Sequence, residues 1–376
     1  IDEGLVGSEM CIRDSNWVCR IKSDVIRYFF WFHLRYKLYY FCIINKFVMK
    51  IFISIASYQD PLLESTIISA YESSKNPENL VFGVCDQSSN PLDIDKFSFK
   101  DQIHYEHIDP LLSEGPCWAR AEIQKKFTNE KYYLQIDSHS QFEEDWDSYL
   151  IKYINKIQEV DSELHKNPII TCYPRAFEVL DYDSHKFSMN RDDKNTHVIT
   201  FREDSMFIKG NFCRQIGAIS SEEITHGFLL AAGFIFTTSD FVKKIPYDPI
   251  FYFYGEEISL VLRAFTRGFG IFHIPEAPLF HLYTDVTDIK RKLHWDTSED
   301  EGRDIKWHQR EEISIERLRK VINNEINDEF GLGDTRSLQD YENLCGVDLK
   351  NMKVLDKQKA YTSEFISKLS WQDSSF

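Results

Sequence analysis

Residues 132–146 read YYLQIDSHSQFEEDW, an apolar run followed at once by polar residues. Its first five residues are mostly aromatic and aliphatic, a composition typical of a buried strand. The polarity then changes abruptly at Asp137, Ser138 and His139. Open α/β sheets bind their ligands at the carboxyl ends of strands, which is where these three residues would lie.

Asp137 and His139 permit two interpretations. Because they stand two positions apart where the chain leaves a strand, both side chains can point at one ion. A mixed oxygen and imidazole site suits Mn²⁺ or Mg²⁺ holding phosphates better than structural zinc. The alternative is an ordinary strand-to-helix turn in which Asp137 is the N-cap. The spacing alone leaves both interpretations open.

The residues before this stretch alternate between strand and helix patterns. We expect strands at 51–55, 80–84 and 103–108, and helices at 62–74 and 115–127. Strand, helix, strand, helix, strand at this spacing predicts a parallel α/β half of Rossmann type, with polar residues at the strand ends. No GxGxxG or GxxxxGK[ST] follows any of these strands, so neither a dinucleotide-binding fold nor a P-loop is supported.

The residues after this stretch predict further elements of the same α/β fold. We expect helices at 146–160 and 256–267, a strand at 169–173, short extended segments at 271–274 and 278–282, and a charged helix from Arg310 that leads to a polar tail. Residues 181–197 are polar and predict a long mobile loop. Residues 231–237 open with Ala-Ala-Gly, and Gly233 would let a ligand approach the backbone closely.

Composition limits the class of protein and its partners. The 376 residues are 43% hydrophobic and carry a formal net charge of -16, which predicts a globular chain that does not bind nucleic acid over a broad face. The eight cysteines are scattered without a CxxC pair, so we expect free thiols in a reducing, cytoplasmic compartment. Residues 25–47 are the most apolar, but five basic residues interrupt them, so we expect no membrane span.

The chain is expected to have three parts. Residues 1–48 lack the periodicity of the rest, and GSEMCIRDS resembles translated adapter sequence, so we expect a non-native or upstream-translated leader and a natural start at Met49. Residues 49–310 would form the catalytic domain. Residues 311–376 would form a helical and polar extension that packs on the domain or trails it.

Three further positions have both a functional and a structural interpretation. His281 closes an apolar run and would be either a metal ligand or a satisfied core histidine. Glu256 and Glu257 open a helix, where the dipole favours acids anyway, or one of them faces a sugar hydroxyl or the reacting centre. Arg120 lies one turn into a helix and would be either a solvated arginine or a phosphate contact.

Several stretches together resemble one family. They are IFISIASYQDP at 51–61, GPCWAR at 115–120, YYLQIDSHSQF at 132–142, AAGFIFTTSDFVKKIPYDP at 231–249, FYGEEISLVLRAFTRGFGIFHIP at 253–275 and LFHLY at 279–283. In this order they resemble the GlcNAc-type glycosyltransferases with a GT-A fold, which include a cytoplasmic transferase that acts on hydroxyproline. The pattern is more distantly similar to the mucin-type polypeptide GalNAc transferases.

The resemblance implies a role for each matching residue. Asp137, His139 and His281 would hold the metal. The donor nucleotide would contact Ala56, Ser57, Tyr58, Asp86, Arg120, Ser138 and Gly233. Glu256, with Glu257 beside it, matches the catalytic glutamate near the donor sugar and the acceptor. The chain would then have a mixed central sheet with helices on both faces.

The function that the resemblance implies is transfer of GlcNAc, or a related HexNAc or hexose, from a UDP-sugar to a hydroxyl of a protein or glycan, with retention. Mn²⁺ or Mg²⁺ would be the cofactor. A non-catalytic module of the same fold that binds a sugar nucleotide or a glycan is the alternative. A metal-dependent hydrolase is less well supported, because the sequence has no further clustered His-Asp motif.

Overall fold

The structure is a computed structural model that describes residues 49–182, 184–208, 213–283 and 291–372. Contacts divide the chain into two units, residues 1–49 and 50–376, and the second unit contains the elements given below. The expected leader at 1–48 lies outside the described residues. Among the described residues, no helix combines the length and the apolar character that a membrane span requires.

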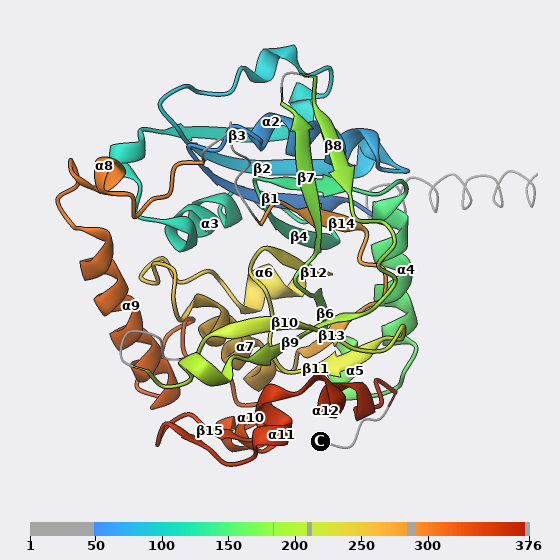
Figure 1. The fold of residues 1–376 in the computed structure, drawn as a ribbon, viewed down its shortest axis with the longest axis vertical. Coiled ribbons are helices and arrows are strands. Elements are labelled where there is room, and N and C mark those ends of the chain that lie inside the picture. Colours follow the sequence, from blue (N-terminus) through green and yellow to red (C-terminus); the bar gives the residue numbers. More distant parts are fainter. Residues whose placement is uncertain (1–48, 183, 209–212, 284–290, 373–376) are drawn as a thin grey trace, which may run out of the picture. The chain divides into compact units, whose positions relative to one another are not determined.

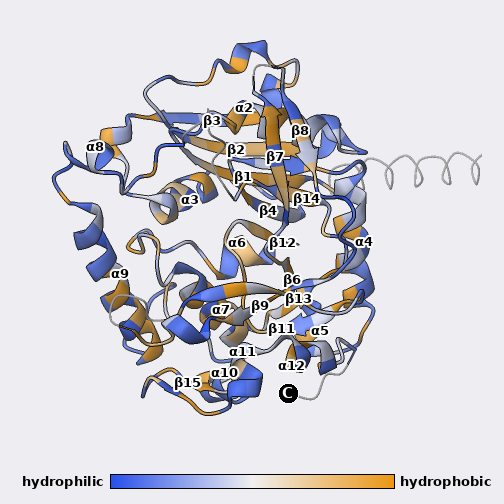
Figure 2. Ribbon diagram, in the orientation of Figure 1, coloured by the Kyte–Doolittle hydropathy of each residue, from blue (hydrophilic) through white to orange (hydrophobic). Residues whose placement is uncertain are grey.

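An eight-stranded mixed sheet organises the second unit (Figure 1). Its order is β11-β13-β6-β12-β4-β1-β2-β3. The strands are β1 (Ile51–Tyr58), β2 (Leu80–Gln87), β3 (Ile103–Ile108), β4 (Tyr132–Asp137), β6 (Pro168–Thr171), β11 (Thr225–Gly227), β12 (Phe234–Thr238) and β13 (Gly270–His273). Figure 2 shows apolar residues concentrated in its central strands. The expected mixed α/β architecture is confirmed.

The first half of this sheet is parallel, as predicted. β1 lies between β2 and β4, and its register pairs Ala56 with both Cys85 and Asp137. The strands are linked by α2 (Leu63–Glu72) and α3 (Pro116–Gln124), and α3 packs against β1 and β2. Parallel strands end at one edge, so this register places Asp137 beside the end of β1.

The second half brings an antiparallel strand against β4. β12 pairs with β4 so that Phe234 lies opposite Ile136, one residue before Asp137. Gly233 therefore lies against the Asp137 side chain, and a Cβ at Gly233 would fall 2.6 Å from the carboxylate Oδ2. Only glycine allows the backbone to approach the carboxylate this closely.

A four-stranded sheet brings the distant His281 to the same edge. Its order is β5-β14-β7-β8, with β5 (Ser140–Phe142), β14 (Leu279–His281), β7 (Arg175–Asp181) and β8 (Lys186–Met189). β14 pairs antiparallel with β5 and places His281 opposite Ser140. This pairing brings His281 close to Asp137 and His139, a proximity that the sequence alone does not indicate.

The prediction of a loop over 181–197 is wrong in part, because 186–189 form β8. This strand pairs antiparallel with β7, and its side chains are exposed or half-buried in alternation. An edge strand that faces solvent does not require an apolar face, so its polar composition resembles that of a loop. The neighbouring pair β9 (His197–Phe201) and β10 (Gln215–Ile219) was also not predicted.

Helices complete the unit. They are α4 (Trp146–Gln158), α5 (Glu163–Lys166), α6 (Asp240–Lys244), α7 (Glu256–Thr266), α8 (Thr297–Asp300), α9 (Trp307–Ile322), α10 (Leu338–Cys345), α11 (Lys357–Tyr361) and α12 (Ser363–Lys368), with the small pair β15 (Val347–Asp348) and β16 (Lys353–Val354). Tyr341 on α10 is fully buried and belongs to the same apolar cluster as Phe265 on α7. The region after 310 thus contributes to the core of the unit.

Candidate active site

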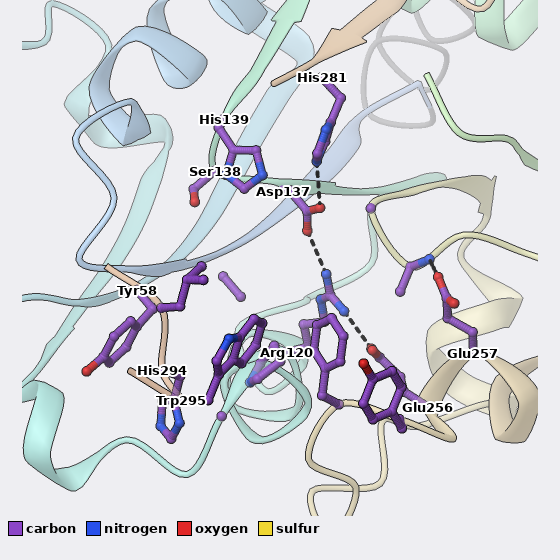
Figure 3. Close-up of a pocket in the computed structure, with 18 of the residues that line it drawn as sticks. Tyr58, Arg120, Asp137, Ser138, His139, Glu256, Glu257, His281, His294 and Trp295 are labelled. Carbon is purple, nitrogen blue, oxygen red and sulfur yellow. Dashed lines mark hydrogen bonds and ion pairs between the residues drawn. The ribbon is translucent and has the colours of Figure 1, made fainter. Parts of the chain in front are cut away.

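A cavity of about 590 Å³ opens where β1 and β4 end and where α7 begins (Figure 3). Ten of the twelve residues predicted for the site line it: Ala56, Tyr58, Arg120, Asp137, Ser138, His139, Gly233, Glu256, Glu257 and His281. Ser57 and Asp86 are not among the described residues that line it. The fold therefore gathers into one cavity residues that are far apart in the sequence, from Ala56 to His281.

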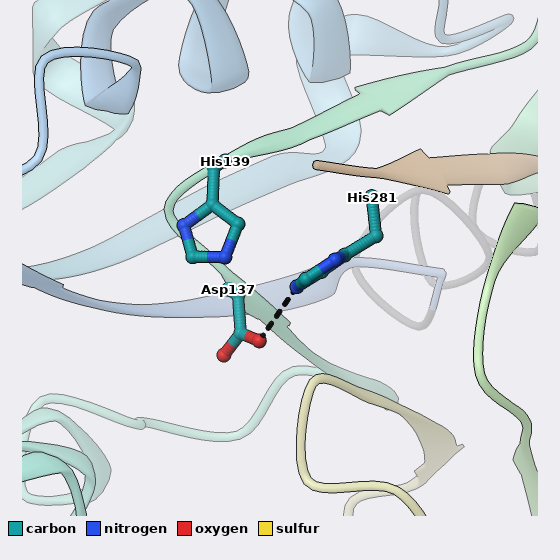
Figure 4. A group of neighbouring side chains, drawn as sticks. All are labelled: Asp137, His139 and His281. Atoms are coloured by element: carbon teal, nitrogen blue, oxygen red, sulfur yellow. Dashed lines mark hydrogen bonds and ion pairs between the residues drawn. The ribbon is translucent and has the colours of Figure 1, made fainter. Parts of the chain in front are cut away.

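Asp137, His139 and His281 form a group that can hold a metal ion (Figure 4). Each offers one ligand atom, and these atoms lie within 4.8 Å of one another. The Nε2 of His281 is 3.1 Å from the Oδ2 of Asp137. The alternative that Asp137 is an N-cap is wrong, because β5 and not a helix follows it.

The protonation of this group favours metal binding. Burial by itself would raise the pKa of Asp137, but the hydrogen bond with His281 and the charge of Arg120 outweigh it and hold the pKa well below its usual range. Burial lowers the pKa of His281, against the opposing effect of Asp137. A carboxylate and a neutral imidazole are the forms that bind a cation.

Asp60 also lines the cavity, in contact with His139, and was missed in the sequence. Its Oδ2 is 2.7 Å from the Nδ1 of His139, and it also accepts a hydrogen bond of 2.8 Å from the hydroxyl of Ser138. The available signal was an acid five positions after the predicted first strand ends, followed by Pro61.

Arg120 connects the metal group to α7. Its Nη2 lies 2.8 Å from the Oδ1 of Asp137, and its Nη1 lies 2.6 Å from the Oε1 of Glu256. The same Oε1 accepts a hydrogen bond of 2.6 Å from the hydroxyl of Tyr247. Because Arg120 is only 5% exposed, the interpretation as a solvated helix arginine is wrong. In this structure Arg120 therefore forms ion pairs with two carboxylates, those of Asp137 and Glu256.

Glu257 has a separate environment from its neighbour. Its Oε1 accepts a hydrogen bond of 2.8 Å from the backbone N–H of Ala232, and its Oε2 accepts one from the side chain of Gln215. Burial raises the pKa of Glu257 to about 7. The two acids are consecutive residues of α7, and successive side chains on a helix point about 100° apart, so their surroundings differ.

The residues at the end of β1 that were predicted to contact the nucleotide point alternately to the two faces of the sheet. Ala56 and Tyr58 line the cavity, whereas Ser57 points the other way, as alternation along a strand requires. Asp86 pairs with Ser57 in register and is 2% exposed. Its Oδ2 accepts hydrogen bonds from the N–H of Leu92 and the hydroxyl of Tyr105. On β2, Gln87 lines the cavity instead.

The rim of the cavity carries groups that we did not predict. Basic side chains from the segments after β9, before β10 and before α8 join Arg120 in lining it: Arg202, Arg214, Arg291 and Lys292. Phe253 and Trp295 also line it, with ring centroids 5.2 Å apart. Cations suit a phosphate ligand and aromatic faces suit a sugar or a base, so this rim fits a sugar nucleotide.

A second cavity of about 520 Å³ adjoins the first. It lies along β10 and shares Tyr173 and Gln215 with the main cavity. A ligand in the second cavity would therefore be within reach of the metal group and the start of α7.

Comparison with known proteins identifies the family. The sequence model described as "Glycosyltransferase (GlcNAc)" matches residues 50–97 and 90–351. The chain belongs to this GlcNAc glycosyltransferase family. No curated protein sequence gives a significant match.

Solved structures share the fold of this family member. GalNAc-T7 with UDP, GalNAc and Mn²⁺ aligns with a TM-score of 0.50 at 11% identity, over 79% of this chain and 54% of that chain. TarS 1–349 of S. aureus in complex with UDP aligns with a TM-score of 0.40 at 12% identity, over 73% of this chain and 72% of that chain. The chain spans about half the length of the GalNAc-T7 chain it matches. The fold is that of the GT-A glycosyltransferases.

Proposed function

We propose that this family member transfers GlcNAc, or a related HexNAc or hexose, from a UDP-sugar to a hydroxyl of a protein or glycan acceptor, with retention and with a divalent metal. One observation carries the proposal: Asp137, His139 and His281 converge inside a cavity that also holds Arg120 and Glu256. This arrangement supports an enzyme better than a module that only binds sugar nucleotides.

The three metal ligands fit Mn²⁺ or Mg²⁺. One carboxylate and two imidazoles are donors that suit Mn²⁺ in particular, and their ligand atoms are close enough to share one ion. When bound, the ion neutralises charge on the diphosphate leaving group. Ala56, Tyr58, Ser138 and Gly233 would contact the nucleotide around it, and Ser57 and Asp86 would support the strand ends from the opposite face.

Glu256 is suited to orienting the donor sugar. Its two hydrogen bonds, from Arg120 and Tyr247, both end on Oε1. We propose that Oε2 accepts a hydrogen bond from a sugar hydroxyl. Glu257 would act as a polar support, because its oxygens bind Ala232 and Gln215. The carboxylate of Glu256, fixed by Arg120 and Tyr247, would contribute to catalysis by positioning the sugar and by electrostatic stabilisation.

The acceptor would approach through the second cavity. That cavity joins the first at Tyr173 and Gln215, and Gln215 also contacts Glu257. An acceptor lying along β10 would thus place a hydroxyl near the carboxylates at the start of α7. A protein or a glycan satisfies this geometry.

The cellular setting proposed here is the cytoplasm. The five described cysteines are all unpaired: Cys85, Cys117, Cys172, Cys213 and Cys345. Free thiols are the usual state in a reducing compartment. The proposed partners are the UDP-sugar and the acceptor, and we expect no nucleic acid.

Release of UDP tests the proposal. The protein is incubated with UDP-GlcNAc, UDP-GalNAc, UDP-glucose or UDP-galactose, after chelator treatment and after restoring Mn²⁺. We expect Mn²⁺-dependent release of UDP, fastest with UDP-GlcNAc, that increases with an accepted hydroxyl compound. Tight binding of UDP without release from any donor would favour the binding module instead.

A further inference from the structure

We infer that Asp60 is a positioning residue that fixes the imidazole of His139, so that its Nε2 faces the cation. The inference rests on the proposed function in one respect, that the cavity holds a divalent cation. Nothing in the sequence patterns assigned Asp60 to the site, and its carboxylate is not in the group of possible metal ligands.

The contacts of Asp60 leave it no part in direct metal binding. Its Oδ2 lies 2.7 Å from the Nδ1 of His139 and accepts a hydrogen bond of 2.8 Å from the hydroxyl of Ser138. Its Oδ1 accepts one of 2.9 Å from the backbone N–H of Leu62. The side chain is only 5% exposed. Both carboxylate oxygens of Asp60 thus accept hydrogen bonds from protein groups, and Oδ2 bonds the ring of His139, a proposed metal ligand.

The backbone before Asp60 is shaped for this contact. β1 ends at Tyr58, and Gln59 has a φ of 47°, a left-handed conformation that is uncommon for a residue with a side chain. The N–H of Gln59 bonds the carbonyl oxygen of Gln87 at 3.0 Å, which holds the turn. Uncommon backbone conformations persist where the surroundings over-determine them, often at functional sites. Here the turn directs Asp60 beneath the loop that carries His139.

That loop is itself fixed on both sides of His139. The hydroxyl oxygen of Thr66 lies 2.7 Å from the carbonyl oxygen of Ser138 and 3.0 Å from that of Ser140, and it accepts a hydrogen bond of 3.0 Å from the N–H of Ser140. Thr66 is fully buried on α2. The backbone is therefore held by Thr66, and the remaining freedom of the His139 ring is removed by Asp60.

The hydrogen bond also selects one tautomer of His139. A carboxylate only accepts hydrogen bonds, so the Nδ1 of His139 must carry the proton when it bonds to Asp60. The lone pair of a neutral ring is then on Nε2. Carboxylates that orient metal-binding histidines in this way typically affect metal affinity by about 10–100-fold.

Asp147 provides a matched control. It is 2% exposed, and its oxygens accept hydrogen bonds from the N–H groups of Lys75 and Asn76 and from the Asn76 amide. It is thus a buried aspartate that stabilises a turn in the same half of the fold, outside the residues that line the cavity. Its replacement should affect stability without affecting the cation.

The experiment compares Asp60→Asn with Asp147→Asn in the full chain. An asparagine at 60 cannot accept at both former oxygens, and an amide N–H directed at His139 would demand the other tautomer. Mn²⁺ affinity is measured by electron paramagnetic resonance with and without UDP, and the tautomer of His139 by ¹⁵N NMR, assigned with His139→Gln. We expect Asp60→Asn to weaken Mn²⁺ binding about 10–100-fold and Asp147→Asn to change it less than about threefold, which is under 1 kcal/mol.

Three results would overturn the inference. They are an Nε2–H tautomer of His139 in the wild-type protein, unchanged Mn²⁺ affinity in folded Asp60→Asn, and equal loss of affinity in both variants. The tautomer needs no donor turnover and is read on the wild type, so it tests Asp60 even if Asp60→Asn does not fold. A protein with the expected tautomer and Mn²⁺ affinities but no release of UDP from any donor would contradict the proposed function alone.

Discussion

The Nε2 of His281 lies 3.1 Å from the Oδ2 of Asp137, although 144 positions separate the two residues. The contact exists because β14 pairs with β5 directly after Asp137 and His139. The parallel half of the main sheet and the late part of the chain therefore meet at one carboxylate. A cation bound by Asp137, His139 and His281 would link these two parts of the chain through its ligands.

Replacement of His281 distinguishes a metal ligand from a core histidine. His281→Gln should weaken Mn²⁺ binding at least about tenfold, as expected for a lost ligand, and should change the free energy of unfolding by less than about 1 kcal/mol. His273→Gln is the control, because His273 is fully buried and its Nδ1 contacts the carbonyl oxygen of Thr171 at 2.7 Å. It should lower stability and leave Mn²⁺ affinity unchanged. The reverse pattern would mean that His281 is structural.

Replacement of Arg120 tests the connection between Asp137 and Glu256. Arg120→Gln leaves two carboxylates in the buried site without their common partner, so we expect a loss of roughly 3–5 kcal/mol in the free energy of unfolding. Lys125→Gln breaks an exposed pair with Glu122 near the same helix and should cost less than about 1 kcal/mol. Urea unfolding measures both.

A double-mutant cycle shows whether the stability lost in Arg120→Gln arises from the unpaired carboxylate of Glu256. Adding Glu256→Gln to Arg120→Gln removes one uncompensated charge and should recover part of the lost stability. Additive losses would show that the two side chains are not coupled in the way their 2.6 Å contact indicates.

The protonation of Glu257 should appear in the pH dependence of stability. Burial raises its pKa from 4.5 to about 7 in the folded protein. Between these pH values the folded protein keeps a proton that the unfolded chain has lost, so this residue makes stability decrease as the pH rises, with no further change above about 7. Glu257→Gln should remove this contribution and gain on the order of 2 kcal/mol over wild type between pH 4 and pH 8.

The quantity to compare is the difference between the two proteins at each pH. The pKa of Glu311 is also raised to about 7 by burial, so the wild-type curve contains a second decrease of the same sign. A difference that stays constant from pH 4 to pH 8 would contradict the assignment to Glu257.

The C-terminal region should be required for the folded catalytic unit. Tyr341 is fully buried, and its hydroxyl donates a hydrogen bond of 2.8 Å to the carbonyl oxygen of Phe228. Tyr341→Ala should cost about 3–5 kcal/mol, the range for large aromatic truncations in a core. Leu355 is 62% exposed, and Leu355→Ala should stay within about 0.5 kcal/mol. Equal thermal midpoints for both variants would contradict this packing.

The parts of the fold that could be predicted have local signals. The apolar run before Asp137 and the abrupt polarity after it marked β4 and its functional end. The helix from Glu256 had a clear apolar face. β8 lacked such a signal because it is a polar edge strand. A helix from Arg310 and a helical extension at 311–376 were predicted, but the polar composition gave no bounds for α10, although one face of this helix is buried.

The site could be predicted less completely, because its contacts are non-local. Asp137 and His139 stood out by their spacing, whereas the local pattern left His281 as either a metal ligand or a core histidine, and only the family resemblance favoured the ligand. The partners of Arg120 lie 17 and 136 positions away, and no local pattern indicates either. The role of Asp60 depends on a contact across 79 positions and on the unusual backbone of Gln59.

Calorimetric titration with UDP tests whether Asp137, His139 and His281 hold a cation to which a UDP-sugar binds. The titration is done with and without Mn²⁺ on wild type, Asp137→Asn and the control Asp147→Asn. We predict that Mn²⁺ tightens UDP binding at least about tenfold, or 1.4 kcal/mol, in wild type and the control, and that Asp137→Asn loses this gain. Equal UDP affinity with and without Mn²⁺ in the wild-type protein, or a full gain in Asp137→Asn, would contradict the account.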